Sequence, residues 1–464
     1  MPTNPQPHHV VVVGAGVAGL AAVRALRGAP VTVTVIDASD HHTFQPLLYQ
    51  VASASLAAED ITVRVRSLLR AQPHARFLRG RVVGLDPERK TVQLEGGEQL
   101  DYDSLLLAAG AESEDFGVAG VRAHAFPLKS VHDALAIRDQ VLRSIEDAAH
   151  AAAAAAAAGR DALPADAEAA LAARTVVVAG AGPTGVEMAG ALAELLARAR
   201  RDLPASAQQA PRVVLVEPTG AVLPSYANAT QAYAARALEA RGVELRLGAS
   251  VASVDPASVT LTDGTTIASR TLVWAAGVRA HPLARALSVP LARGGRVPVT
   301  DRLHLAAHPD VFVVGDLAGP AGDGAALPQV AQVAMQMGSH AARVIRARLR
   351  GREAPAFRYA DRGQMAIIGR GAGVAELSRR LGGARMRGLV GWLAWLALHL
   401  AYLPGAANRA RVLATWLLEL TQRDRAADLA VGRVTPTEAR DTGSAATRAH
   451  VAASEGAMGW HRAA

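Results

Sequence analysis

Hydrophobic residues in this chain form short continuous runs, each followed by a stretch with helical periodicity. Val10–Val13 and Val176–Val178 are two such runs, and each leads directly into a glycine-rich turn. Runs without polar alternation are typical of strands buried on both faces of a parallel sheet. The pattern therefore predicts an α/β fold with two strand–turn–helix units. The turn glycines are Gly14, Gly16 and Gly19 in the first unit and Gly180, Gly182 and Gly185 in the second.

The same order of elements recurs after each glycine turn. Val82–Pro87 resembles Val251–Pro256, and each is followed by short alternating stretches with a glycine turn. Each half then ends in an apolar run that reaches Ala-Ala-Gly, at Leu105–Gly110 and at Leu272–Gly277. We therefore expect two Rossmann-like domains, each with a parallel sheet, a small antiparallel meander and a return strand.

The pattern changes after Gly277. Val311–Asp316 predicts a buried strand that ends in Gly-Asp, and a helix follows from about Pro328 to Arg350. A further strand is expected at Met365–Gly369. This third segment most simply returns to the first domain, which makes the second domain an insertion.

The glycine spacing indicates what both domains bind. In G-x-G-x-x-G the first glycine makes the turn, the second admits a pyrophosphate and the third lets the helix pack on the strand. The helix N-terminus then attracts the phosphates. Asp37 and Glu217 end the second strand of each unit, where a carboxylate can accept hydrogen bonds from a ribose. The alternative is that both acids simply end strands at the surface. Two such sites predict two dinucleotides that exchange electrons.

Neighbouring residues favour a particular dinucleotide in each domain. Glu217 is followed by Pro-Thr-Gly without a lysine or arginine, so a 2′-phosphate would meet an anion and no cation. This favours NADH over NADPH. The Gly315-Asp316 strand end brings a second chain segment to the first site. A ligand held by two segments suits FAD better than a loosely held nicotinamide cofactor, so we expect FAD in the first domain and NADH in the inserted one.

Composition excludes some classes of chemistry. The 464 residues include no cysteine, which excludes a disulfide framework, a redox-active dithiol and a thiolate-bound iron–sulfur cluster. The net charge is +8, but nearly all basic residues are arginine, with Lys90 and Lys129 as the lysines. Eight arginines against two acids lie between Arg379 and Arg425, beside apolar segments. This placement favours an anionic membrane surface over nucleic acid, with solvated helix faces as the alternative. The first nine residues show no apolar signal segment.

Two apolar segments near the C-terminus indicate where the chain resides. Leu389–Leu403 has 15 residues, and Val412–Leu420 follows after Pro404. Spanning a bilayer takes about 20 apolar residues, so neither segment is expected to cross. Tryptophan and tyrosine favour the headgroup region, and this pair of segments predicts a monotopic anchor in the interface. The aromatic residues are Trp392, Trp395, Tyr402 and Trp416. The alternative is an ordinary core or dimer helix pair.

The domain bounds follow from these segments. We expect an FAD-binding domain at 1–130 and 279–380, and an NADH-binding domain at 131–278 with an alanine-rich insertion at 148–173. Membrane-associating helices are expected at 381–435 and a disordered tail at 436–464. The alanine tract Ala148–Ala158 has high helix propensity and no amphipathic face, so we expect an exposed helix extension or a mobile insertion without function.

Four stretches resemble a known family. His41–Ser53 (HHTFQPLLYQVAS), Gly180–Gly190 (GAGPTGVEMAG), VFVVGD and Ala331–Gln336 (AQVAMQ) look like type II NADH:quinone oxidoreductases, single-chain respiratory flavoproteins that do not pump protons. The resemblance covers about residues 8–430. Two residues depart from the family pattern, because Asp40 stands where asparagine is usual and Ala109 where threonine is usual.

The resemblance implies a set of site residues. Glu187 would lie near the nicotinamide and the flavin. The alternative is that Glu187 only interacts with the dipole of its helix, as an acid in the first turn. Gln332 and Gln336 share a helix face, and their amides could bind quinone carbonyls unless they are ordinary surface glutamines. Lys129 matches a lysine that the family often has. The expected FAD contacts are Gly14, Gly16, Gly19, Asp37, Gln45, Pro46, Leu47, Val82, Gly110, Gly315, Asp316 and Ala331. The expected NADH contacts are Gly180, Gly182, Gly185, Glu217 and Gly277. No metal site is expected.

These observations predict a peripheral enzyme on the cytoplasmic face of the cell membrane. It would transfer hydride from NADH to FAD and two electrons onward to a membrane quinone, without ion pumping. The quinone would enter between the C-terminal helices and the Gln332–Gln336 helix, and a homodimer could form through the C-terminal helices. Two alternatives remain, a soluble NADH-dependent reductase of a protein such as ferredoxin and a redox sensor that binds NADH and FAD with little turnover. Sulfide:quinone oxidoreductases share the plan but use cysteines that this chain lacks.

Overall fold

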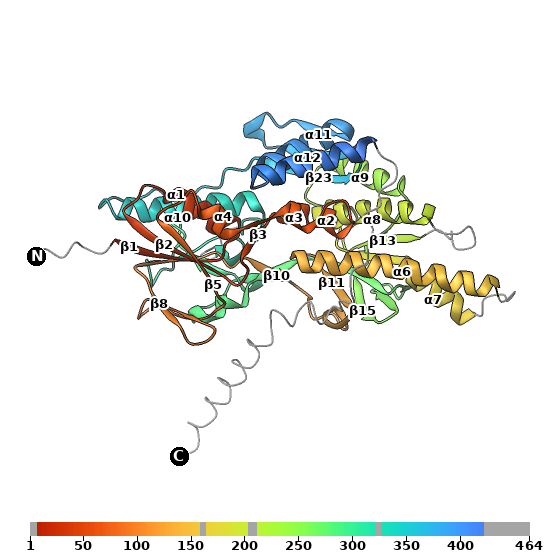
Figure 1. Cartoon of the computed structure of the whole chain (residues 1–464), viewed down its shortest axis with the longest axis horizontal. Helices are drawn as coiled ribbons and strands as arrows, with labels where there is room; N and C mark the ends of the chain where they lie inside the picture. The colour runs from red at the N-terminus through yellow and green to blue at the C-terminus, as the bar shows by residue number, and fades with distance from the viewer. Residues whose placement is uncertain (1–6, 158–163, 203–210, 321–325, 422–464) are drawn as a thin grey trace, which may run out of the picture. The chain divides into compact units, whose positions relative to one another are not determined.

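The chain forms two compact units. The computed structural model describes residues 7–157, 164–202, 211–320 and 326–421. Unit 1 comprises Met1–Thr43, Thr62–Glu112 and Val278–Ala360, and unit 2 comprises Phe44–Ile61, Ser113–Gly277 and Asp361–Ala464. Figure 1 shows the elements of each unit. Each unit is described separately below.

Unit 1 is built on a parallel five-stranded sheet in the order β21-β9-β1-β2-β5. The strands are β1 (His8–Val13), β2 (Val31–Asp37), β5 (Ala75–Arg79), β9 (Ser104–Leu107) and β21 (Val311–Val313). Helices α1 (Val17–Ala25) and α10 (Ala331–Arg348) pack against each other, as Figure 1 shows. Their approach depends on Gly338, because a Cβ there would overlap the carbonyl oxygen of Ala18.

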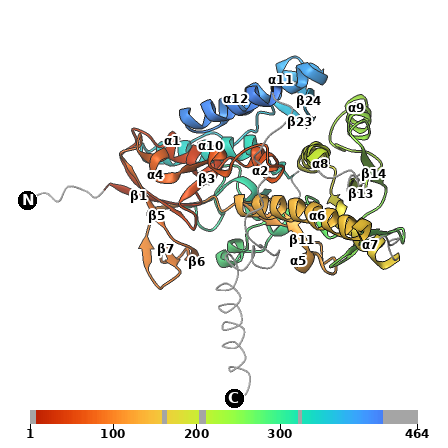
Figure 2. The ribbon, with the colours of Figure 1, turned by 45° about the vertical axis from the view of Figure 1, so that its right-hand side comes forward.

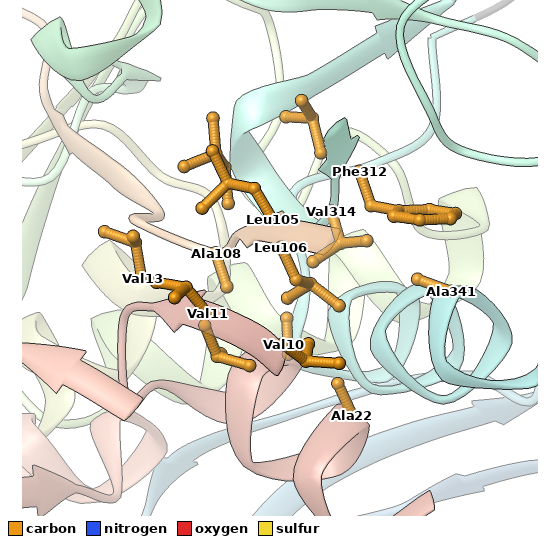
Figure 3. Close-up of a cluster of buried hydrophobic side chains, with 14 of the residues drawn as sticks. Val10, Val11, Val13, Ala22, Leu105, Leu106, Ala108, Phe312, Val314 and Ala341 are labelled. Atoms are coloured by element: carbon orange, nitrogen blue, oxygen red, sulfur yellow. The ribbon is translucent and has the colours of Figure 1, made fainter. Parts of the chain in front are cut away.

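The core of unit 1 is formed by the apolar runs that the sequence shows. Figure 3 shows valines of β1 and leucines of β9 beside Phe312 of β21, with Ala22 and Ala341 contributed by the two helices. Val10–Val13 and Leu105–Leu107 are almost completely buried, because the sheet is covered on both faces. The expected buried strands are therefore confirmed.

Unit 2 repeats this sheet. Its parallel strands have the order β11-β18-β12-β13-β14, with the first strand of the glycine motif again in the centre. The strands are β11 (Ala125–Pro127), β12 (Thr175–Ala179), β13 (Arg212–Glu217), β14 (Val243–Leu247) and β18 (Thr271–Trp274). The helices of this part are α5 (Val121–His124), α6 (Val131–Ala157), α7 (Pro164–Arg174), α8 (Pro183–Asp202) and α9 (Asn228–Glu239). The α/β class with two Rossmann-like sheets is confirmed.

Each unit also carries the predicted three-stranded antiparallel meander. Unit 1 has β6 (Val82–Asp86), β7 (Thr91–Leu94) and β8 (Gln99–Asp101), and unit 2 has β15 (Val251–Asp255), β16 (Ser258–Leu261) and β17 (Thr266–Ala268). The register of both meanders shifts at the third residue of the first strand, at Gly84 and at Ser253. The internal repeat thus extends to an irregularity of the hydrogen bonding.

Short elements connect these sheets. Those in unit 1 or at its chain crossings are β3 (His41–Thr43), β4 (Thr62–Arg64), α4 (Val65–Leu69), β10 (Ala111–Ser113), β19 (Val278–Ala280), η3 (Pro282–Leu287), η4 (Arg293–Gly295), β20 (Val297–Val299), η5 (Gly315–Leu317) and β22 (Ala318–Pro320). Those in unit 2 are η1 (Gln45–Leu47), α2 (Leu48–Ala52), α3 (Ala58–Ile61) and η6 (Arg379–Leu381).

The C-terminal part of unit 2 is a small antiparallel sheet followed by two helices. The sheet contains β23 (Gly363–Gly369), β24 (Ala372–Leu377) and β25 (Arg385–Arg387), and the helices are α11 (Gly388–Tyr402) and α12 (Ala406–Thr421). Gly373 and Gly391 let α11 lie close to β24, because a Cβ on either would meet backbone atoms of the other segment. In the described ranges, no helix has the length and apolar character that a membrane span requires.

The bounds of unit 1 and unit 2 differ in three stretches from the domain bounds expected from the sequence. Residues 44–61, 113–130 and 361–380 were expected in the FAD-binding domain and group with unit 2. Leu47 and Leu48 are buried in the core of unit 2, and Gly190 of α8 lets β23 approach so closely that a Cβ there would overlap the carbonyl oxygen of Ile368. The two units are defined by contacts between residues, whereas the expected domains were defined by the nucleotide that each binds. The assignment of FAD to one unit and NADH to the other therefore stays a prediction. Three parts of the expected domains lie outside the described residues: 158–163 of the alanine-rich stretch, 422–435 of the membrane-associating segment, and the tail 436–464.

Candidate active site

The first glycine loop joins β1 to α1 and has the geometry that its spacing predicts. Gly14 has a φ of +105°, and a Cβ on it would overlap the carbonyl oxygen of Ala108. A Cβ on Gly19 would overlap the carbonyl oxygen of Gly14. In contrast, no atom lies within 4 Å of the place where a Cβ on Gly16 would stand. Packing therefore requires the first and third glycines, and the second faces open space suited to a pyrophosphate.

The second glycine loop joins β12 to α8 and repeats this geometry. Gly180 has a φ of +95°, and its Cβ would lie 2.7 Å from the carbonyl oxygen of Ala275. A Cβ on Gly185 would overlap the carbonyl oxygen of Gly180, and no atom lies within 4 Å of one on Gly182. Both loops therefore fit a dinucleotide with its pyrophosphate at the N-terminus of the following helix.

The two acids at the strand ends hold these loops in place. Asp37 accepts hydrogen bonds from the backbone N–H of Ala15 (2.7 Å) and of Ser39 (2.8 Å). Glu217 accepts from the N–H of Ala181 (2.6 Å) and from the hydroxyl of Thr219 (2.8 Å). Each carboxylate is thus positioned beside its own loop, and ribose binding by either stays a prediction.

Further residues expected at the FAD site lie at the carboxyl end of the unit 1 sheet. Gly315 has a φ of +71°, and a Cβ on it would lie 3.5 Å from the Cβ atoms of Ala18 in α1 and Ala334 in α10. The carbonyl oxygen of Asp316 accepts a hydrogen bond from Gln329 (3.2 Å). The 311–316 segment therefore meets the helix of the first glycine loop, as its Gly-Asp ending suggested. Elsewhere, Gly110 has a φ of +74°, Val82 begins β6, and Ala331 begins α10.

Two residues of unit 1 were missed by the sequence argument. The ring of His42 in β3 is buried, and its Nδ1 donates to the carbonyl oxygen of Ala15 (2.9 Å), which can only accept. Burial lowers the pKa of His42, so the ring is neutral. Arg296 is also buried, donates to the carbonyl oxygens of Ala318 and Leu327, and has a pKa lowered by burial and raised by Asp316. Arg296 stands in none of the four stretches that resemble the family, and the His41–Ser53 stretch gives no sign that His42 contacts Ala15, so only tertiary contacts identify these two roles.

The two glutamines expected at the quinone lie in the first two turns of α10. Gln332 is the second residue of the helix and is half-buried. The amide of Gln336 donates to the carbonyl oxygen of Ala360 (3.0 Å) and accepts from its N–H (2.9 Å). This pairing gives Gln336 a structural role that the sequence did not indicate, and quinone binding by either glutamine stays a prediction.

The remaining predicted contacts lie in unit 2. The side chain of Gln45 donates to the carbonyl oxygen of Lys129 (3.3 Å), Pro46 is half-buried, and Leu47 is buried. The carbonyl oxygen of Gly277 accepts from the N–H of Glu114 (3.0 Å). The structure therefore places Gln45–Leu47 in unit 2, while the glycines expected to hold the same cofactor are in unit 1.

Glu187 is a buried acid of α8. Its Oε1 accepts hydrogen bonds from the N–H of Ile367 (3.3 Å) and from the indole N–H of Trp395 (3.2 Å). Burial raises its pKa to about 8, against the opposing effect of these two hydrogen bonds, so the carboxyl is mostly protonated at neutral pH. It also lies beyond the first turn of α8, and a protonated acid there gains little from the helix dipole.

The tryptophans of the C-terminal helices correct one expectation. Trp392, Trp395 and Trp416 were expected at a headgroup boundary, but all three are buried in unit 2. Hydrogen bonds stabilise the burial of two of them, because Trp395 donates to Glu187 and Trp416 donates to Oε1 of Gln50 (2.9 Å). Of the four aromatic residues, Tyr402 is the exposed one, at 42%.

The outer surfaces of α11 and α12 are apolar nevertheless. Figure 2 shows the two helices following one another along the chain, and leucines on both are about half exposed. The exposed apolar face is defined by Leu389, Val390, Leu393, Leu398, Tyr402, Leu413, Leu417, Leu418 and Leu420. The sequence predicted apolar helices here, and only their packing shows which residues face outward.

Comparison with known proteins decides the family. The model of the pyridine nucleotide-disulphide oxidoreductase family matches residues 8–338. Two proteins of Mycobacterium tuberculosis are each 37% identical: type II NADH:quinone oxidoreductase Ndh, over 89% of this chain and 88% of that protein, and NdhA, over 90% and 88%. The chain belongs to the type II NADH:quinone oxidoreductase family.

A solved structure confirms the fold of this family member. NDH2 of Plasmodium falciparum in complex with NADH matches with a TM-score of 0.79 and 17% identity, over 92% of this chain and all of that one. The resemblance found in the sequence is therefore confirmed. The broader family is named for disulphides, whereas this chain contains no cysteine.

Proposed function

We propose that this chain oxidises NADH and reduces a membrane quinone with FAD as its bound cofactor, without ion pumping. The observation that carries the proposal is the pair of glycine loops, which have the same geometry and each leave the second glycine open to a pyrophosphate. Membership of the type II family supports it. Bound FAD would supply a two-electron carrier between NADH and the quinone. The family does not favour a ferredoxin-type reductase or a redox sensor.

Each unit would hold one dinucleotide. In unit 1, the glycine loop and Asp37 would hold the adenosine diphosphate of FAD, with Asp316 near the ribityl chain. Val82, Gly110, Gly315 and Ala331 would complete this site. Gln45, Pro46 and Leu47 belong to unit 2, and their role at the flavin ring stays a prediction from the sequence. In unit 2, Gly180, Gly182, Gly185, Glu217 and Gly277 would hold NADH. The protein would align the two dinucleotides and exclude water, which replaces a bimolecular encounter by an oriented transfer.

Three residues are proposed for the reacting groups. Glu187 would stand beside the nicotinamide as a neutral acid, because burial keeps it protonated at neutral pH. Gln332 and Gln336 would offer neutral amides to the quinone carbonyls, which places no charge in an apolar site. For Gln336 this role has to coexist with its two hydrogen bonds to Ala360.

Anaerobic stopped-flow spectroscopy tests this function. Flavin absorbance should bleach on mixing with NADH, more slowly with NADPH, and recover on mixing with ubiquinone or menaquinone. A protein that stays colourless after saturation with FAD, or a flavin that NADH does not bleach, would contradict the proposal. Recovery with ferredoxin and with neither quinone would favour the protein-acceptor alternative.

The exposed apolar face of α11 and α12 would rest on an anionic lipid surface. Arginines exposed nearby, Arg379, Arg380 and Arg385, would interact with the headgroups, as expected for an interfacial helix pair. We place this surface at the cytoplasmic face of the cell membrane. A homodimer through the same face is the competing arrangement.

Vesicle flotation separates these arrangements. The wild-type protein should float with vesicles of anionic phospholipid, and Leu393→Ser with Leu417→Ser should abolish flotation. Leu247→Ser, which changes an exposed leucine of β14, is the matched control. A dimer in size-exclusion chromatography that these two substitutions dissociate, without flotation of the wild type, would favour the homodimer.

A further inference from the structure

Trp395 of α11 is fixed inside unit 2 beside Glu187. Its side chain is fully buried, and its indole N–H donates to Oε1 of Glu187 from a position 208 residues away in the sequence. The ring of His399 stacks on the indole with 3.8 Å between centroids. The Nδ1 of His399 donates to the carbonyl oxygen of Trp395 at 2.8 Å, which fixes the stacked ring. The indole N–H is therefore held toward the carboxyl.

Several titratable side chains lie around Glu187 and Trp395. Tyr49 from α2 and Tyr226 from the segment before α9 each interact electrostatically with Glu187, and His399 from α11 stacks on Trp395. The carboxyls that also act on the tyrosines are Glu194 and Glu419 for Tyr49 and Glu376 for Tyr226. Burial raises the pKa of both tyrosines and lowers that of His399 to about 4, so all three are neutral at pH 7. The groups that oppose burial at Glu187 are the two hydrogen bonds from Ile367 and Trp395. Trp395 is the one of these that a substitution can remove.

The opposite side of the same helix belongs to the exposed apolar face. Leu389, Val390 and Leu393 are more than half exposed, while Trp392 and Trp395 point into the core. One helix thus presents leucine to the outside and an indole N–H to the buried acid. The backbone contact between Gly391 and Gly373 fixes this helix on the sheet below it.

We propose that Trp395 is a positioning residue for Glu187, through which α11 orients the acid that the proposed function places beside the nicotinamide. The inference rests on that function for its catalytic meaning. Its structural part, that α11 controls the titration and orientation of Glu187, can be measured without turnover.

Trp395→Phe removes the N–H donor and keeps most of the aromatic packing. Losing a donor destabilises the charged carboxylate, so the titration midpoint of Glu187 should rise by about half to one pH unit. A less firmly oriented acid should lower kcat by about three- to ten-fold. The KM for NADH should change less than two-fold, because the glycine loop and Glu217 are untouched.

Infrared difference spectroscopy over a pH titration follows the protonated carboxyl directly. Glu187→Gln identifies the band, and Trp395→Phe should keep that band to higher pH than the wild type. Trp416→Phe is the matched control, since it also loses one buried indole hydrogen bond, but to Gln50. Both variants should retain FAD and show similar thermal unfolding. If Trp395→Phe fails to fold, Trp395→His tests the same contact with a smaller donor.

The outcomes are distinguishable. Equal shifts in Trp395→Phe and Trp416→Phe, or no shift in either, would overturn the proposal. A shift of the pH–rate profile that persists in the Glu187→Gln, Trp395→Phe double variant would also overturn it. If the wild type does not oxidise NADH, the proposed function fails while the infrared result still tests the contact.

Discussion

The glycine loops of the two units share their contacts with the neighbouring strand but differ in what holds the residue after the first glycine. In both, the first glycine donates to the strand at 2.8 Å and the next N–H binds the acid at the end of that strand. The carbonyl oxygen of Ala15 is held by the imidazole of His42 at 2.9 Å. The corresponding oxygen of Ala181 is held by the backbone N–H of Leu223 at 2.8 Å.

This difference shows that one loop conformation can be stabilised in two ways. A backbone donor persists under most substitutions and does not titrate, whereas a histidine can be replaced and can take up a proton. At this carbonyl oxygen the loop of unit 1 should therefore depend on one side chain that titrates, and the loop of unit 2 should not. The predictions below test the shared features first and the difference afterwards.

The largest effect is expected from the third glycine of each loop. In Gly19→Ala and Gly185→Ala the new methyl group would overlap a backbone oxygen of the same loop. We expect the displaced loop to lose about 3 kcal/mol of binding free energy for its dinucleotide, which is about 100-fold in affinity. Gly19→Ala should be purified nearly free of FAD, and Gly185→Ala should keep FAD but bind NADH weakly. Flavin absorbance per protein and NADH titration measure both. Normal FAD content in Gly19→Ala would contradict the assignment of FAD to unit 1.

The second glycine should separate binding from folding. No atom lies within 4 Å of a Cβ on Gly16 or Gly182, so alanine there should leave the thermal unfolding midpoint unchanged. The methyl group would instead contact the pyrophosphate and lower the affinity of that loop for its dinucleotide about ten-fold. Gly182→Ala should raise the KM for NADH alone. If it unfolds at a lower temperature, the space in front of the loop is not a ligand site.

Removing the hydrogen bond from His42 to the first loop should have a smaller effect. His42→Phe leaves the carbonyl oxygen of Ala15 without its donor and should release FAD about five-fold faster, with the KM for NADH unchanged. Flavin fluorescence after dilution measures the release. His41→Phe, at the neighbouring half-buried position, is the control and should behave as the wild type. Equal release from both variants would show that the imidazole does not hold the loop.

The same histidine predicts a pH dependence. Burial lowers the pKa of His42 in the folded protein, so the unfolded chain binds the proton more readily. Its contribution to stability is therefore present above the ordinary histidine pKa of about 6.5 and is lost as the pH falls below it. Between pH 7.5 and pH 5 the free energy of unfolding, measured by chemical denaturation, should fall more in the wild type than in His42→Phe. An identical loss in both proteins would assign the pH dependence to other groups.

The smallest effect is expected from the charge of the second acid. Glu217→Gln keeps an oxygen for the N–H of Ala181 and removes the charge that a 2′-phosphate would meet. The ratio of kcat/KM for NADPH to that for NADH should rise about three-fold. Asp37→Asn is the control and should leave this ratio unchanged. A rise in the control as large as in Glu217→Gln would reject the role of Glu217 in cofactor choice.

Local features allowed much of the fold to be predicted. The strand ends, both glycine loops and both meanders follow from continuous apolar runs and from glycine spacing, because these depend on backbone geometry over a few residues. The apolar segments at the C-terminus likewise correspond to α11 and α12. The grouping of β23 with α8 was not predictable, because it depends on the close approach at Gly190, a glycine that no turn requires.

The sequence by itself therefore determined the α/β class, the paired dinucleotide loops and the family resemblance, since each lies within a short stretch. Tertiary structure alone decided that Trp395 contacts Glu187 and that His42 holds Ala15. It also decided that the tryptophans of α11 and α12 face inward while leucines face outward. The physical reason is that burial and hydrogen bonding join residues up to hundreds of positions apart, and composition and periodicity carry no information about which distant partner a side chain meets.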